Sequence, residues 1–119
     1  MTYFVLQTVK DILGFTDTNN DTLLNDLGAQ ADDHINDRLH EFYVILPIAS
    51  PDAAIIDAAN NFTIGRYFKE TGQIDRGKVF WDYGEMEISV FIHSALQKKE
   101  ATFVPQYFIN TTGNFFRNP

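Results

Sequence analysis

Asp17, Asn19 and Asp21 alternate along the chain as the first three ligands of a calcium-binding EF-hand loop do. That loop also needs a glycine at its sixth position and a bidentate glutamate at its twelfth, where this chain has Thr22 and Gly28. We therefore predict a polar turn that caps a helix and no calcium site.

His34 stands among carboxylates at helical spacing: Asp33 and Asp37 belong to the same segment, and Glu41 follows one turn later. Bundle proteins that hold two metal ions use Glu-x-x-His pairs on two helices, and that motif is absent here. The segment is predicted to be a solvated acidic face. An enzyme or metal protein that uses His34, Asp33 and Asp37 stays open as an alternative.

The other histidine of interest is His93, in SVFIHSAL, where it lies near the apolar side of a predicted helix. No recognisable nucleophile motif surrounds it, and the chain has no G-x-S-x-G, HExxH, P-loop or GxGxxG sequence. We expect no enzymatic activity and no cofactor.

Composition limits the partners. The 119 residues carry a net charge of −7 and no cysteine, which argues against binding by phosphate neutralisation and excludes disulfides and thiolate metal sites. No apolar run is long enough to cross a membrane, and the N-terminus lacks the basic and apolar regions of a signal peptide. A single soluble domain without membrane contact is expected.

A long amphipathic helix from Asn20 to Leu46 is predicted at the centre of the domain, and Pro47 ends it. Its acidic residues project away from an apolar stripe that recurs at steps of three and four. The stripe consists of Leu24, Leu27, Ala31, Ile35, Leu39 and Phe42.

Two further helices flank this one in sequence. Residues 3–13 form a short helix that Gly14 ends and that packs on the central helix as an antiparallel pair. Ser50 as N-cap and Pro51 at the first position begin another helix, rich in alanine, which ends near Gly72.

A fourth helix is predicted over residues 75–98. Gly77 and Gly84 weaken it, so irregular first turns are expected in the region 72–86. Its predicted buried stripe consists of Val79, Phe80, Tyr83, Met86, Val90, Phe91, Ala95 and Leu96.

The last segment, residues 101–119, has no helical period and is predicted to be an extended arm beyond a helical domain of residues 1–100. Its aromatic residues either fold back over their own helices or fill pockets on a neighbouring copy or a partner protein. These residues are Phe103, Tyr107, Phe108, Phe115 and Phe116.

The order of elements resembles a known family. TVKDILGF, a polar turn, LLNDLGAQADDHINDRL and the Pro-started AAIIDAANNFTIGRYF are together similar to the head-to-tail connector proteins of tailed bacteriophages, also called adaptor or head-completion proteins. The resemblance covers roughly residues 5–96, and the aromatic and glycine content of IDRGKVFWDYGEME departs from it.

The resemblance implies a small all-α bundle of about four helices that forms a dodecameric ring below the portal protein, at the head-tail junction of the virion, after assembly in the host cytoplasm. Such a ring gives the tail or stopper protein a docking surface and lets DNA pass through its channel without specific binding. The C-terminal arm would grip the portal. Acidic residues would line the channel, with Asp32, Asp33 and Asp37 as candidates.

A small monomeric or dimeric helical protein with a binding or regulatory role, its arm packed on itself, is the main rival hypothesis.

Overall fold

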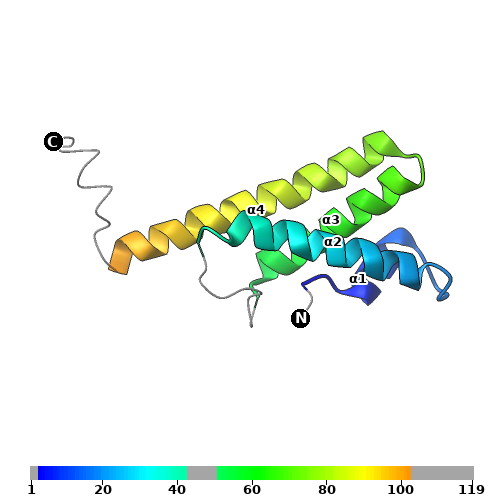
Figure 1. Ribbon diagram of the computed structural model, residues 1–119, viewed down its shortest axis with the longest axis horizontal. Helices are drawn as coiled ribbons and strands as arrows, with labels where there is room; N and C mark the ends of the chain where they lie inside the picture. Colours follow the sequence, from blue (N-terminus) through cyan, green and yellow to red (C-terminus); the bar gives the residue numbers. More distant parts are fainter. Residues whose placement is uncertain (1–2, 43–50, 103–119) are drawn as a thin grey trace.

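The computed structural model describes residues 3–42 and 51–102, which form four α-helices without a strand (Figure 1). This confirms the predicted all-α fold. The α3–α4 pair forms a long antiparallel hairpin, and α2 packs along it (Figure 1). The helices are α1 (Leu6–Leu13), α2 (Asp21–Leu39), α3 (Ala53–Glu70) and α4 (Ile74–Thr102).

α3 makes the most extensive contacts in the bundle, above all with α4. The second helix, predicted to be central, also contacts each of the other three helices, but less extensively than α3 does. Small residues explain the difference: Ala58, Ala59 and Gly65 are buried, and their size lets neighbouring helices come close to α3.

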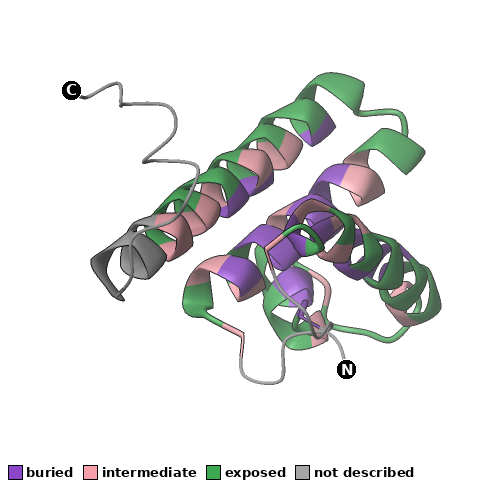
Figure 2. Cartoon of the chain, turned by 60° about the vertical axis from the view of Figure 1, so that its left-hand side comes forward, coloured by how far each residue is buried: buried purple, intermediate pink, exposed green. Residues whose placement is uncertain are grey.

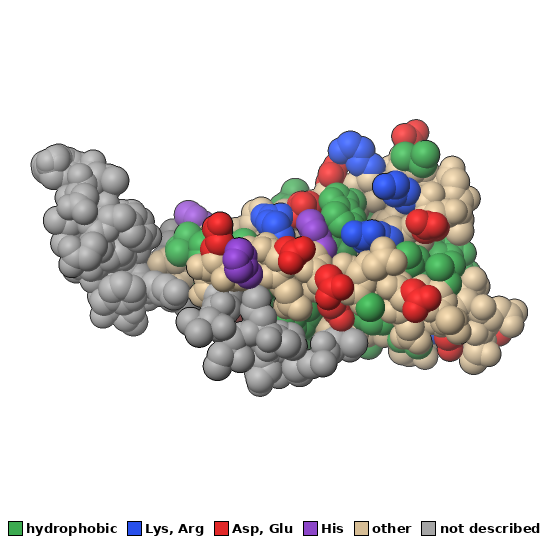
Figure 3. Space-filling model, viewed as in Figure 1, with side chains coloured by type: hydrophobic (Ala, Val, Ile, Leu, Met, Phe, Trp, Pro, Cys, Tyr) green, Lys and Arg blue, Asp and Glu red, His purple; other side chains and the backbone are tan. Residues whose placement is uncertain are grey.

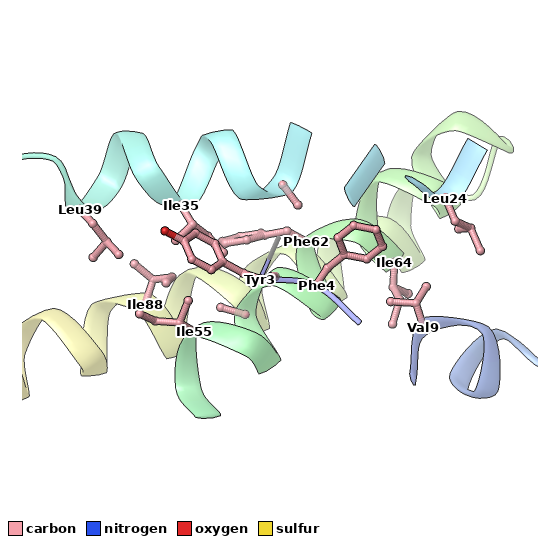
Figure 4. Packing of buried hydrophobic residues seen from close by; sticks show 13 residues of the cluster. Tyr3, Phe4, Val9, Leu24, Ile35, Leu39, Ile55, Phe62, Ile64 and Ile88 are labelled. Atoms are coloured by element: carbon pink, nitrogen blue, oxygen red, sulfur yellow. The ribbon is translucent and has the colours of Figure 1, made fainter. Parts of the chain in front are cut away.

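The core lies between α2 and the hairpin (Figure 4). Five members of the predicted stripe of α2, from Leu24 to Leu39, are buried as expected. Phe62 of α3 and Ile88 of α4 complete the core from the other side. Val9 of α1 is buried, whereas Val5, the N-cap residue before this helix, and Ile12 are exposed.

Several predicted helix boundaries were wrong. α1 begins at Leu6, three residues after its predicted start. α2 ends at Leu39, short of Leu46, and the Phe42 N–H donates to the Leu39 carbonyl in the turn that follows. The aromatic and β-branched residues that follow in the sequence disfavour a longer helix. The N-cap of α3 is Asp52, whose carboxylate accepts from the Ala53 N–H at 3.0 Å, and Ser50 lies outside the described residues.

α4 is regular from its first turn, contrary to the irregular start expected from its glycines. Gly77 N–H donates to the Gln73 carbonyl at 2.9 Å. Gly77 faces α3, and Gly84 faces the ring of Phe62, where a Cβ atom would lie 2.7 Å from a ring carbon. Both glycines therefore serve close packing rather than a break. The helix continues to Thr102, two residues into the predicted arm.

Candidate functional site

The segment before α1 is anchored on α2 by Asp32. The carboxylate oxygen Oδ1 of Asp32 accepts from the backbone N–H groups of Tyr3 and Phe4 at 3.1 and 3.3 Å. One turn further along α2, Asn36 Oδ1 accepts from the Tyr3 hydroxyl at 2.6 Å. One turn earlier, the ring of Phe4 fills the space that a side chain on Gly28 would need. Tyr3 and Phe4 thus lie between α2 and α3 (Figure 4).

Asp32 was a candidate for lining a DNA channel, and this prediction was wrong. Its side chain is buried, because it satisfies two backbone donors of the N-terminal segment. Burial raises the pKa of Asp32 from 3.8 to about 6, and the two backbone hydrogen bonds oppose that rise.

The other two channel candidates, Asp33 and Asp37, are exposed on α2. Their role in a channel stays a prediction.

His34 turns away from these aspartates and toward the hairpin. Its ring packs edge-on against Phe62 and lies 4.8 Å, centroid to centroid, from Trp81. Its Nε2 is 3.4 Å from Glu85 Oε2, and Arg38 donates to the other oxygen of Glu85. His34 is therefore not part of a solvated acidic face as predicted, and in place of the alternative cluster with Asp33 and Asp37 it belongs to a cluster that joins α2 to α4.

Among the described residues, no group of three or more His, Asp or Glu side chains is arranged to hold a metal ion. In the EF-hand-like segment, the Asn19 N–H donates to Asp17 Oδ1 at 3.0 Å and Asp21 pairs with Lys10 at 2.9 Å. These contacts are those of a polar turn at the start of α2.

Four apolar side chains of α4 lie on the side that faces away from the bundle. Val79, Tyr83, Met86 and Val90 are spaced by four, three and four residues, so they share one face of the helix. They are between 48% and 61% exposed, and Figure 2 shows green along the outward side of α4 before its grey last turns. We call this set the outer stripe.

The outer stripe corrects the prediction that these four residues are buried. α4 carries apolar residues on more than one side, and the side with the glycines and Ile88 packs on α3. Phe80 and Phe91, also in the predicted stripe, are half-buried beside this packed side.

An open pocket of about 450 Å³ lies between α3 and α4, at the end where the hairpin turns. Gly65 and Gly77 bring the two backbones together beside it, and Trp81 and Ile74 give it an apolar lining. Three basic side chains surround it: Arg66, Lys69 and Lys78. Sequence reasoning missed this pocket, although the clustering of basic residues between 66 and 78 in an acidic chain was a usable signal.

The predicted partner-binding residues of the arm, Phe103 to Phe116, lie outside the described residues. Among the helices that are described, none is long and apolar enough to span a membrane.

No protein-family model matches the chain, and no curated protein or solved structure is significantly similar to it.

Proposed function

We propose that this chain is a structural virion protein without catalytic activity, a head-to-tail adaptor. In this role it forms a ring, a dodecamer in the family that it resembles, between the portal protein and the tail or stopper protein. The ring continues the DNA channel, and the protein acts by docking and not by chemistry.

The outer stripe is the observation that carries the proposal. Four large apolar side chains in a row on one helix face leave apolar surface in water, and contiguous surface of this kind usually marks a contact with another macromolecule. A ring needs two different complementary patches on each subunit. We assign the outer stripe to one of them, covered by a neighbouring copy of the chain.

The order of the elements in the sequence supports the same role. A short first helix, a polar turn, a longer second helix and a Pro-started alanine-rich helix are the features through which the sequence resembles the connector family. The exposed positions Asp33 and Asp37 are compatible with a channel wall that repels phosphate.

The test is removal of residues 103–119, which leaves all four described helices in the chain. We expect the helicity measured by circular dichroism to stay nearly unchanged while capture by the portal protein is lost. A portal gene and a capsid gene beside the gene for this chain are also expected. Loss of the cooperative thermal transition on truncation would instead show that the arm completes the chain's own core.

The pocket between α3 and α4 favours a second candidate function, that of a small monomeric or dimeric helical binding or regulatory protein. A portal gene elsewhere in the genome, together with unimpaired binding of a small partner after truncation, would favour this candidate.

A further inference from the structure

The pocket beside Trp81 combines an apolar floor with a positive rim. Trp81 rests on Phe62, with the ring centroids 4.5 Å apart, and so is held in place from below. The guanidinium carbon of Arg66 lies 5.0 Å from the centroid of the Trp81 ring. An indole fixed in this way offers the pocket a rigid apolar wall against which another side chain can pack.

The charges around the pocket differ from those of the whole chain. Arg66, Lys69 and Lys78 surround it, and Asp82 is the one carboxylate among the residues that line it. Asp82 pairs with Lys78 at 2.8 Å, but both side chains are more than half exposed, so this pair is weak and exchangeable. In the part of the chain that the structure describes, Arg66 and Lys69 pair with no carboxylate.

Arg66 has unused hydrogen-bonding capacity. Its Nη1 donates to Gln30 Oε1 at 3.0 Å, which fixes the side chain against α2. Its Nε is buried and has no hydrogen-bond partner among the described residues. A buried donor without a partner carries a free-energy cost, and a ligand reaches this atom only if the Arg66 side chain shifts.

We propose that this pocket binds an acidic peptide segment of a partner protein, with one apolar or aromatic residue as the anchor. The anchor packs against Trp81 beside Ile74, and the flanking carboxylates pair with Lys69, Lys78 and Arg66. Figure 3 shows Lys and Arg side chains at this end of the molecule with hydrophobic side chains between them and Asp and Glu side chains beside them.

The openness of the site favours a peptide over a small molecule. The Lys78 side chain is 73% exposed and Ile74 is 65% exposed. Sites for small molecules usually bury most of the ligand's surface, and walls as exposed as these would leave most of that surface in water. A nucleic acid is disfavoured, since its phosphates gain little from an apolar floor and three basic side chains are few for a backbone with a charge at every nucleotide.

Trp81 is the single tryptophan of the chain, so its fluorescence reports on the pocket directly. The full chain is titrated with an end-blocked pentapeptide that has a central phenylalanine between two pairs of glutamates. We expect a saturable fluorescence change that weakens at high salt. A peptide with glutamines in place of the glutamates, and one with alanine in place of the phenylalanine, are expected to bind more weakly.

The variants Lys69→Gln and Lys78→Gln are each expected to weaken binding about twofold to fivefold, as for one exposed ion pair. Lys98→Gln is the matched control, since it removes one positive charge from α4 about 25 Å from Trp81 along the helix. It is expected to leave the affinity unchanged, and circular dichroism checks that every variant is folded.

Three results would overturn the assignment. One is a fluorescence signal that does not change with millimolar acidic peptide. Another is equal weakening by Lys98→Gln and Lys69→Gln. The third is an equal saturable response to inorganic phosphate alone, which would make the site a simple anion site.

Discussion

Gly65 and Gly77 place the backbones of α3 and α4 in direct contact. A Cβ atom on Gly77 would lie 2.6 Å from the Gly65 carbonyl oxygen, and one on Gly65 would lie 2.9 Å from the Gly77 carbonyl oxygen. Both clashes are with backbone, which cannot rotate away as a side chain can. This contact fixes the end of the hairpin and the depth of the pocket beside Trp81.

Gly77→Ala is therefore expected to destabilise the fold by about 1–3 kcal/mol, even though alanine favours a helix more than glycine does. Chemical denaturation measures the free energy of unfolding. Ser94→Ala, at an exposed position of α4, is the control and is expected to have little effect. Stabilisation by Gly77→Ala would show that the helices are not in backbone contact.

Met86→Ala and Ile88→Ala separate the two sides of α4. Met86 is 61% exposed and Ile88 is fully buried. Ile88→Ala is expected to cost about 2–5 kcal/mol of unfolding free energy because it leaves a cavity, and Met86→Ala about 0.5 kcal/mol or less. The unfolding free energies of the two variants, measured by thermal or chemical denaturation, test this difference. Similar losses for both variants would mean that the outer stripe is packed within its own chain.

Asp32 gives the stability a defined pH dependence. Its pKa is raised from 3.8 to about 6 by burial, so the folded state binds the proton more tightly than the unfolded state does. The stability that this group contributes is fully present below pH 3.8 and is lost as the pH rises through 6.

Asp32→Asn removes this dependence and keeps an oxygen that can accept from Tyr3 and Phe4. The unfolding free energy of the variant minus that of the wild type is expected to rise on the order of 2–3 kcal/mol between pH 4 and pH 7. Denaturation at a series of pH values measures the difference. Asp33→Asn, at the exposed neighbouring position, is the control. If the unfolding free energies of Asp32→Asn and the wild type changed with pH in the same way, the account would be contradicted.

Glu85 joins α2 to α4 through Arg38. A double-mutant cycle with Arg38→Met and Glu85→Gln is expected to give a coupling energy of about 0.5–1 kcal/mol that falls with added salt, since both side chains are about one-third exposed. The same cycle on Lys78 and Asp82, a more exposed pair, is expected to give less. Equal coupling energies in the two cycles would show that the Arg38–Glu85 pair is as exposed to solvent as the Lys78–Asp82 pair.

Much of the fold was predictable because three of the helices show their boundaries or their buried faces in the sequence. The stripe of α2 from Leu24 to Leu39 has a single apolar side, so its period identifies the core face. Gly14 and Gly72 adopt positive φ angles of 79° and 89° at the ends of α1 and α3, where the sequence predicts the helices to stop.

The errors arose where a residue's role depends on a distant segment. α4 has apolar residues on several sides, so periodicity alone selected the outer stripe as core. The face that packs is marked instead by Gly77 and Gly84, which are seven residues apart. Gly77 contacts the backbone of α3 at Gly65, and Gly84 contacts the ring of Phe62. In the same way, Asp32 looks like any other acidic residue of α2 until the N-terminal segment is placed on it.

The most direct test of the assembly role is site-specific photo-crosslinking from the outer stripe. A photoreactive amino acid replaces Tyr83 or Met86 in the full chain, produced together with the proteins that neighbouring genes encode, and the crosslinked peptides are identified by mass spectrometry. Asp26, exposed on α2 and therefore outside the stripe, is the control position. The account predicts efficient crosslinks from the stripe to a second copy of the chain. Crosslinks confined to the chain's own residues 103–119, or no enrichment over Asp26, would contradict it.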